Sequence, residues 1–370
     1  MNKHTLSSEQ MPPRPNLSRR QCLAFIASGL LAAGCAPASQ VPANTGQHAS
    51  TPTVPALQRG ALQPIHVGNA GHIKSLTTLT PESVAVAWSP TGSVLAIGSA
   101  ENAIQVWDVA TLKQLRTLQG HSDRVNRIRW SPDGRLLASA SDDGTVRLWD
   151  GQRDIPQAVL RGPFASNTVL SVAWSPDSRR LVAGYGNGAV EIWDAATNTG
   201  HALLGQQATD LRTKAVWGIA WSPDGKWIIS PQYDGILHVW KTESGGLSRT
   251  LHADDLPNDV QWRPDGRTFA SSSDKGTVQL WEPATFSNRT TLTISGNNGW
   301  VYPLAWSPDG RLLAGGYQTG LIQIWDAGTG TGIHTWQGHT DRVWDLAWSP
   351  DGRLIASASK DETVRLWGTT

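Results

Sequence analysis

Three short stretches with a regular alternation of apolar and polar positions lie between residues 342 and 367. They read RVWDLAW, RLIASAS and TVRLW. An alternation with a period of two is typical of β-strands. The intervening SPDG and KDE segments favour turns, because proline presets φ at the second turn position and glycine accepts a positive φ. The pattern therefore predicts a three-stranded meander.

The same meander recurs along the chain. Residues 338–367 (GHTDRVWDLAWSPDGRLIASASKDETVRLW) are nearly copied at residues 120–149 (GHSDRVNRIRWSPDGRLLASASDDGTVRLW). Two tryptophans 19 residues apart mark each of seven copies. The pairs are Trp88 with Trp107, Trp130 with Trp149, Trp174 with Trp193, Trp221 with Trp240, Trp262 with Trp281, Trp306 with Trp325, and Trp348 with Trp367. Successive copies begin 42, 44, 47, 41, 44 and 42 residues apart. A constant interior with variable joints predicts the blades of a propeller.

The residues that open and close these copies resemble the WD-repeat family of β-propellers. Gly-His opens two copies, at Gly120-His121 and Gly338-His339. Trp-Asp closes four copies, at Trp107-Asp108, Trp149-Asp150, Trp193-Asp194 and Trp325-Asp326. The resemblance covers about residues 72–370. It implies an all-β fold, a seven-bladed propeller of four-stranded antiparallel blades.

In that family a buried histidine, a serine or threonine, a turn aspartate and the tryptophan form a hydrogen-bonded tetrad. The resemblance implies one tetrad of His121, Ser139, Asp143 and Trp149, and a second of His339, Ser357, Asp361 and Trp367. Ser141 and Ser359 are alternatives for the serine, because they share its strand face. The fourth blade keeps Asp234 without the histidine, and the fifth has Lys275 at the turn position, so the complete network is expected in two blades.

Residues 1–35 predict an export signal. Arg19 and Arg20 precede an apolar run of roughly fifteen residues, which is too short to span a bilayer stably. The segment SRRQCL resembles a twin-arginine signal, although Cys22 stands where that pattern prefers phenylalanine. LAAGC at residues 31–35 resembles a bacterial lipoprotein box, in which Cys35 is lipidated and anchors the chain to a membrane. Plain cleavage near residues 36–38 and an uncleaved anchor are the alternatives.

The segment between the signal and the repeats, residues 36–71, predicts a flexible linker. It is rich in Pro, Ala, Ser, Thr and Gly and shows no periodicity. Residues 72–79 alternate again and predict an outer strand. Because the sequence stops three residues after Trp367, we expect this strand to complete the last blade. Such a closure removes two exposed sheet edges.

Composition and motifs argue against several kinds of chemistry. The formal net charge is +1 and charged residues make up 16% of the chain, so no basic field marks a nucleic-acid site. The ten histidines show no metal-ligand spacing. Neither a glycine-rich phosphate loop nor a nucleophile elbow is present. The sequence therefore predicts a noncatalytic protein with no cofactor and no metal.

Residues that break the repeat are the candidates for function. In the WD-repeat family, partners contact the narrower top face, at the start of the innermost strand and just before the turn aspartate. Large side chains at these positions gather in blades four, six and seven: Trp217, Tyr233, Trp300, Tyr302, Arg342 and Trp344. They either form a binding patch or pack the channel.

The combined prediction is a monomeric protein- or peptide-binding scaffold at the bacterial cell envelope. Its membrane contact would be the lipid anchor on Cys35, and without lipidation the protein would be secreted or periplasmic. The alternative is a glycan-binding module or a propeller enzyme outside the cytoplasm, because a ring of aromatic side chains can also stack on sugars.

Overall fold

The computed structural model describes residues 57, 61–79, 83–150, 155–162, 168–204, 215–294 and 299–369, without the side chains of 201–203. The predicted export signal, Cys35 and most of the predicted linker lie outside these residues. A short 3-10 turn, η2 (Ala70–His72), precedes the first strand. No helix within the described ranges is long and apolar enough to cross a membrane.

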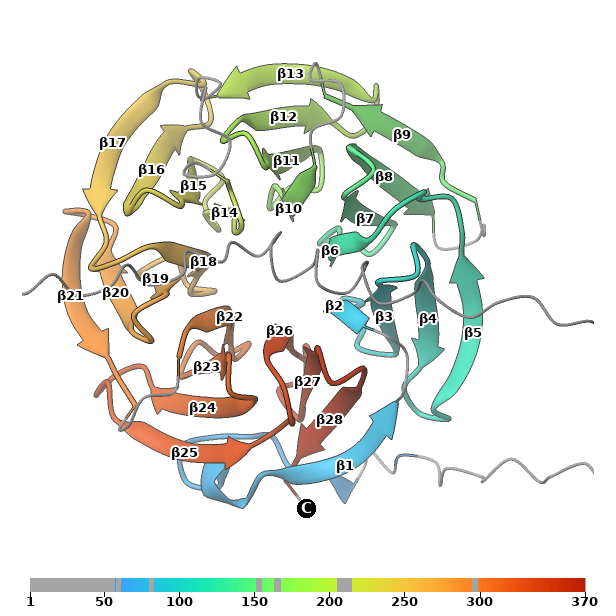
Figure 1. Ribbon diagram of the computed structural model, residues 1–370. Coiled ribbons are helices and arrows are strands. Elements are labelled where there is room, and N and C mark those ends of the chain that lie inside the picture. Colours follow the sequence, from blue (N-terminus) through green and yellow to red (C-terminus); the bar gives the residue numbers. More distant parts are fainter. Residues whose placement is uncertain are drawn as a thin grey trace, which may run out of the picture. The chain divides into compact units, whose positions relative to one another are not determined.

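The described residues form seven four-stranded antiparallel sheets arranged in a ring (Figure 1), which confirms the predicted fold class. We number the blades 1 to 7 in chain order, each from its innermost strand. Blades 1 to 3 consist of β2 (Ser83–Trp88), β3 (Val94–Ser99), β4 (Ile104–Asp108), β5 (Lys113–Leu118); β6 (Val125–Trp130), β7 (Leu136–Ser141), β8 (Thr145–Asp150), β9 (Ala158–Arg161); and β10 (Val169–Trp174), β11 (Arg180–Tyr185), β12 (Val190–Asp194), β13 (Thr199–Leu204).

The remaining blades follow the same plan. Blades 4 to 7 consist of β14 (Ala220–Trp221), β15 (Trp227–Gln232), β16 (Ile236–Lys241), β17 (Leu247–His252); β18 (Pro257–Trp262), β19 (Phe269–Ser273), β20 (Val278–Glu282), β21 (Ser287–Leu292); β22 (Val301–Trp306), β23 (Leu312–Tyr317), β24 (Leu321–Asp326), β25 (Gly332–Gln337); and β26 (Val343–Trp348), β27 (Leu354–Ser359), β28 (Val364–Gly368), β1 (Lys74–Leu79).

The N-terminal strand completes the last blade, as the sequence predicts. β1 pairs antiparallel with β28, in a register that runs from Lys74 opposite Gly368 to Leu79 opposite Val364. In Figure 1 the blue first strand lies along the red last strand. The pairing closes the ring and covers the edge that β28 would otherwise expose.

Residues 61–73, just before β1, also pack on the ring. Gln63 forms a β-bridge with Thr369, and the backbone N–H of Ile65 donates to the carbonyl of Gly352 at 2.9 Å. Four apolar side chains of this segment are buried: Leu62, Ile65, Ala70 and Ile73. Residues 61–71 belong to the predicted linker. Their irregular spacing of apolar residues matches neither strand nor helix, which is why periodicity does not reveal this contact.

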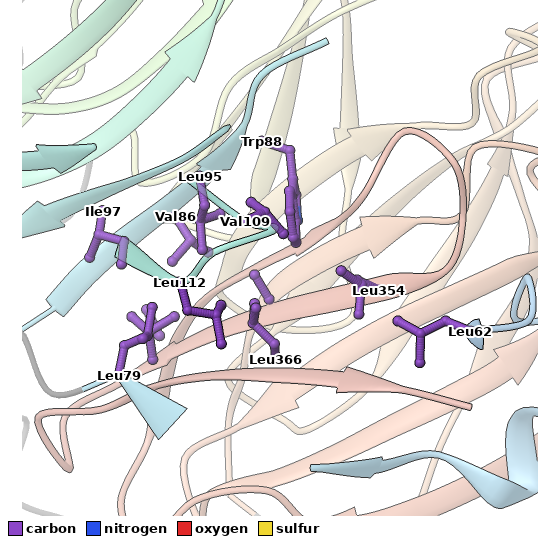
Figure 2. Close-up of a cluster of buried hydrophobic side chains, with 13 residues drawn as sticks. Leu62, Leu79, Val86, Trp88, Leu95, Ile97, Val109, Leu112, Leu354 and Leu366 are labelled. Carbon is purple, nitrogen blue, oxygen red and sulfur yellow. The ribbon is translucent and has the colours of Figure 1, made fainter. Parts of the chain in front are cut away.

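The apolar core consists of seven clusters, each between two neighbouring blades. Figure 2 shows the cluster between blades 1 and 7, where Trp88 and Leu95 pack with Leu354 and Leu366, and Leu62 joins them from the N-terminal segment. Each sheet is thus covered on both faces, which accounts for the apolar residues on successive positions of many strands.

The first tryptophan of four repeats links its blade to the preceding one. Its indole N–H donates to the carbonyl just before the first tryptophan of that blade. These bonds are Trp88 to Ala347 (3.0 Å), Trp174 to Arg129 (3.0 Å), Trp306 to Gln261 (3.1 Å) and Trp348 to Ala305 (3.0 Å). The repeated tryptophan therefore supplies both apolar area and a directional bond between blades.

A continuous hydrogen-bond chain joins the four tetrad residues of blade 2. The Trp149 indole N–H donates to Ser139 Oγ at 2.9 Å, Ser139 Oγ lies 2.6 Å from His121 Nε2, and His121 Nδ1 lies 2.8 Å from Asp143 Oδ2. An indole N–H can only donate, so Ser139 Oγ is the acceptor in its bond with Trp149. The hydroxyl proton of Ser139 then remains for the bond to His121 Nε2, which accepts it. The neutral imidazole then carries its proton on Nδ1 and donates it to the Asp143 carboxylate.

The same chain joins Trp367, Ser357, His339 and Asp361 in blade 7, with distances of 2.8, 2.6 and 3.0 Å. Burial lowers the pKa of both histidines, that of His339 to about 4, so both imidazoles are neutral at pH 7. Blades 4 and 5 keep a shorter version, in which Trp240 donates to Ser230 and Trp281 to Ser271.

The two alternative serines lie elsewhere on the same strands. The hydroxyls of Ser141 and Ser359 donate to the backbone carbonyls of Asp123 and Asp341, each at 3.0 Å. They therefore hold the loops that follow the two tetrad histidines, rather than the tryptophans.

Stepwise truncation should separate strand closure from packing of the N-terminal segment. We compare chains that begin at residues 57, 74 and 80. The chain beginning at 74 keeps β1 but loses four buried apolar side chains, so its melting temperature should fall by several degrees. The chain beginning at 80 also loses β1 and should aggregate, because β28 becomes an open edge. Size-exclusion chromatography and thermal unfolding measure both effects. Equal behaviour of all three chains would contradict the closure.

The tetrad histidine should matter for stability and for its pH dependence. His339→Ala breaks the bonds to Ser357 and Asp361 and should cost about 1–3 kcal/mol at pH 7. In the intact protein, the pKa of His339 is about 4 when folded against about 6.5 when unfolded. The unfolded chain therefore binds the proton more readily in this window. The free energy of unfolding should fall as the pH drops from 6.5 towards 4, by up to about 1.4 kcal/mol per pH unit for this group.

Urea unfolding at several pH values measures both effects. The His339→Ala variant should show a shallower fall than the intact protein below pH 6.5, because His121 still contributes. His252→Ala, at an exposed position at the end of β17, is the matched control and should leave both the stability and the slope unchanged. An unchanged slope in His339→Ala would mean that this imidazole is not the titrating group.

Candidate partner-binding face

Four of the six residues predicted to contact a partner lie together where blades 6 and 7 begin. Trp300 precedes β22 and Tyr302 lies within it, while Arg342 precedes β26 and Trp344 lies within it. The Tyr302 ring centroid lies 5.6 Å from that of Trp300 and 5.9 Å from that of Trp344. Equivalent positions of adjacent blades lie side by side. Tyr302 and Trp344 occupy the same repeat position in blades 6 and 7, which is why their rings come together. We call these four residues the aromatic cluster.

Arg342 ties the two tryptophans of the aromatic cluster together. Its guanidinium carbon lies 5.1 Å from the Trp344 ring centroid and 5.9 Å from that of Trp300, both within cation–π range. Arg342 is 6% exposed and Tyr302 3%, whereas Trp300 and Trp344 are half-buried. Tyr302 and Arg342 thus support the cluster from within, and the two tryptophans present its remaining surface.

The other two predicted residues, Trp217 and Tyr233, lie on blade 4. The Tyr233 hydroxyl donates to Asp274 Oδ2 at 2.6 Å, and Asn258 Nδ2 donates to the other oxygen of the same carboxylate at 2.8 Å. Trp217 precedes the two-residue strand β14. Next to it, a Cβ on Gly218 would come within 2.8 Å of the Asp259 backbone, so blades 4 and 5 approach closely here. Both residues thus belong to blade 4, whereas the aromatic cluster belongs to blades 6 and 7.

Arg124, from blade 2, also contacts Trp344. Its guanidinium carbon lies 4.9 Å from the ring centroid, although blade 1 stands between blades 2 and 7 in the ring. The sequence carries a signal for this residue. Arg124 in GHSDRV occupies the position of Arg342 in GHTDRV, so the near-copied repeats place two arginines at equivalent points. Arg342 is among the residues predicted to contact a partner, whereas Arg124 is not.

An ion network crosses the central channel beneath these side chains. Arg127 on β6 pairs with Asp345 on β26 at 2.7 Å and with Asp259 on β18 at 3.7 Å, and Arg129 approaches Asp345 at 3.2 Å. Blades 2, 5 and 7 are not neighbours, so the Arg127 side chain must extend across the channel. Burial opposes its charge, but the two aspartates outweigh that effect and raise the pKa of Arg127.

Backbone amides complete this network. Asp345 Oδ2 accepts the N–H of Val86 on blade 1 at 3.1 Å, and Asp259 Oδ2 accepts that of Leu304 on blade 6 at 3.1 Å. Buried carboxylates need such partners, because desolvation is costly unless the charge is compensated. The position three residues before the first tryptophan provides the sequence signal. It is charged in three blades and uncharged in the others: Arg127, Asp259 and Asp345 against Ala85, Ser171, Gly218 and Pro303.

The arrangement supports recognition by contact. It combines half-buried indole surfaces, a phenol and guanidinium groups, which are the side chains that dominate binding hot spots. Within the described ranges, no three His, Cys, Asp or Glu side chains lie together as a metal site would require.

Short segments of the chain resemble repeats in larger proteins. A probable serine/threonine-protein kinase PkwA from Thermomonospora curvata is 54% identical over 50 residues, which is 14% of this chain and 7% of the relative. The APC/C activator protein CDH1 of Saccharomyces cerevisiae is 39% identical over 57 residues, 15% of this chain and 10% of the relative. The WD repeat-containing protein srw1 of Schizosaccharomyces pombe is 39% identical over 41 residues, 11% of this chain and 7% of the relative. The similarity thus spans a tenth or less of each relative's length.

Comparison with protein families covers most of the propeller. The WD domain, G-beta repeat, matches residues 71–108, 112–150, 155–194, 205–241, 245–282 and 330–368. The WD40 domain of anaphase-promoting complex subunit 4 matches residues 286–344, where the sixth blade lies. Together with seven four-stranded blades closed by β1, these matches establish that the chain belongs to the WD-repeat family of β-propellers.

Proposed function

We propose that the protein is a noncatalytic scaffold that binds a protein or peptide partner through the aromatic cluster. A WD-repeat propeller fits a protein-interaction scaffold in general. The aromatic cluster supports the choice of face, because two half-buried tryptophans are held by a buried tyrosine and a buried arginine. Preorganised aromatic side chains lose little conformational entropy when a partner binds.

Comparison with equivalent positions supports a binding role over ordinary channel packing. Tyr302 and Trp344 stand four residues before the first tryptophan of their blades. The same position holds Val84, Asn126, Leu170 and Asn258 in blades 1, 2, 3 and 5. These smaller residues occur in blades that close normally, so ring geometry does not demand large rings at this point. The aromatic residues are therefore additions to the repeat.

We further propose that the scaffold acts at the bacterial cell envelope, held by a lipid on Cys35. This part rests on the sequence: Arg19 and Arg20, the short apolar run after them, and the LAAGC segment. A lipid anchor together with a linker would keep the propeller near a membrane while leaving it free to meet partners in solution.

Removal of one half-buried indole of the aromatic cluster should weaken binding without unfolding the ring. Trp344→Ala or Trp300→Ala should weaken capture of the partner from envelope extract by about 2 kcal/mol or more, roughly thirtyfold in Kd. The melting temperature should change little. Leu115→Ala is the matched control, because Leu115 is 53% exposed on the outer strand β5, away from the cluster.

The same variants test the rival interpretations. A lower melting temperature with unchanged affinity would assign the tryptophans to channel packing and remove this binding face. Binding of the intact protein on a glycan array, lost in Trp344→Ala, would favour a glycan-binding module instead. Hydrolase activity that these variants abolish would favour a propeller enzyme.

The envelope proposal has its own test. Cys35→Ser should move the protein from the membrane fraction to a soluble or unprocessed form, because the lipid chain would supply the anchoring energy. Cys22→Ser is the matched control and should leave the distribution unchanged. A wild-type protein that is soluble without detergent, with its N-terminus at Ser39, would show plain cleavage instead.

A further inference from the structure

We propose that the outer edge of blades 1 and 2 rests on the surface of an anionic membrane. The contact residues lie on β5, on β9 and just before β9: Lys113, Leu115, Arg116, Ile155, Val159 and Arg161. We call these six residues the basic rim. This inference rests on the proposed location at the cell envelope and specifies which side of the propeller faces the lipid headgroups.

The first argument is the exposure of apolar side chains at this edge. Among the described residues, five large apolar side chains are exposed, and three of them belong to the basic rim. Ile155, Leu115 and Val159 are 66%, 53% and 42% exposed. β5 and β9 are the outer strands of neighbouring blades (Figure 1). Single exposed apolar residues are common on proteins, whereas a group of them marks a contact surface.

The second argument is the charge of the outer strands. None of the seven outer strands contains an Asp or Glu. They contain six Lys or Arg residues, and three of these belong to the basic rim. Cations on a sheet edge also prevent two edges from pairing. That role does not require exposed aliphatic side chains on the same strands, whereas a membrane surface favours both, because cations attract anionic headgroups and aliphatic groups enter the boundary beneath them.

The strand register directs several of these side chains to one place. Arg116 stands opposite Val106, which packs in the cluster between blades 1 and 2, so Arg116 shares the face of blade 1 that meets blade 2. On β9, Leu160 packs in the cluster between blades 2 and 3. Because side chains alternate along a strand, Val159 and Arg161 lie on the other face of blade 2, toward blade 1. Both strands thus contribute to the outer end of the same boundary between blades.

Positive charge is concentrated at this boundary. Burial lowers the pKa of Arg147, and the charge of Arg161 lowers it further, although Asp143 opposes both effects. The carboxylate that ends β4, Asp108, accepts the N–H and the hydroxyl of Thr111 at 2.7 and 2.6 Å. The acidic group nearest to β5 along the chain is therefore bonded within its own turn. A concentration of cations favours an anionic surface as the partner.

The third argument is the place where the N-terminal segment reaches the ring. Leu57 is the first described residue, and its backbone N–H donates to the carbonyl of Ala110 at 3.1 Å, in the turn between β4 and β5. Lys113 follows three residues later. Cys35 stands 22 residues before Leu57, and a flexible chain of that length has a root-mean-square end-to-end distance of about 25 Å.

A lipid on Cys35 would therefore hold the basic rim close to the headgroups. At such a high effective concentration a weak surface contact is enough to orient the propeller. Contact through the outer edge also leaves both ends of the central channel accessible, so the aromatic cluster stays open to a partner in solution.

Sedimentation with vesicles tests the basic rim without the lipid anchor. The mature chain, residues 36–370, is mixed with phosphatidylcholine vesicles that contain or lack phosphatidylglycerol. It should bind only the vesicles with phosphatidylglycerol. The combined change Lys113→Gln, Arg116→Gln and Arg161→Gln should weaken binding at least about tenfold, because each cation near an anionic surface contributes about fivefold. Leu115→Ala should weaken it at least about threefold.

The other outer strands provide matched controls. The combined change Lys74→Gln, Arg249→Gln and Arg289→Gln removes the same charge from blades 7, 4 and 5, and should leave binding within about twofold of the unchanged chain. Leu247→Ala is the control for Leu115→Ala, because Leu247 is similarly exposed on the outer strand of blade 4. Thermal unfolding of each variant checks that the ring remains folded.

A single fluorescent label reports the orientation. Cys22 and Cys35 are the two cysteines of the sequence, so the mature chain from residue 36 contains none. Gln114→Cys places a label on β5, and Thr290→Cys places one on β21, on the opposite side of the ring (Figure 1). A quencher on the lipid headgroups should quench the label on β5 at least about threefold more strongly.

The outcomes separate the basic rim from the proposed function. Equal losses in the two triple variants, or no binding to phosphatidylglycerol, would overturn the rim. A dimer in solution that Leu115→Ala dissociates, without vesicle binding, would assign the edge to contact between copies and also overturn it. Trp344→Ala should lose partner capture and keep vesicle binding, and Leu115→Ala should do the reverse. Vesicle binding by a protein that carries no lipid in cells would overturn the anchor on Cys35 and leave the rim standing.

Discussion

Each sheet in this ring can bury its two faces only against its neighbours, and the rest of the structure depends on this constraint. The apolar residues form seven interfaces of comparable composition in place of one central core. No blade can be stable alone, because its faces would lie open to water. All seven interfaces between blades can therefore form together only when β1 closes the ring. Indole bonds such as that from Trp88 to Ala347 add direction, because they tie four of the blades to the blade before them.

The sequence was sufficient to predict the fold because the repeat encodes local geometry seven times. Tryptophan pairs at constant spacing, the SPDG turns and the missing outer strand lead to the number of blades and to closure without long-range information. Packing of residues 61–73 could not be predicted in the same way. Leu62 packs in one cluster with Leu354, and Ile65 packs in another with Trp367. Such contacts exist only once the ring has folded, and no periodicity in the sequence indicates them.

The candidate site was predictable in part. Residues that break the repeat pattern predicted the aromatic cluster. Equivalent positions of successive repeats lie on the same face of a propeller, so unusual residues at these positions come close together. The partners of those positions were not predictable, since side chains cross the channel. Arg124 reaches Trp344 over blade 1, and Arg127 joins Asp259 and Asp345 from blades that do not touch. Which residue meets which across the axis depends on side-chain length and direction, which a single sequence does not specify.

The pairing of the first strand with the last has a consequence for biosynthesis. β1 emerges from the ribosome long before β28, so it stays without its partner strand until almost the entire chain has been synthesised. Such a distant contact forms late, after the local meanders have folded. A chain that ends early in blade 7 would lack β28, and β1 and the incomplete blade would then remain open to proteases and to aggregation. Because the ring closes only when β28 has been made, only a completed polypeptide can reach the stable fold. The topology thus distinguishes complete chains from truncated ones.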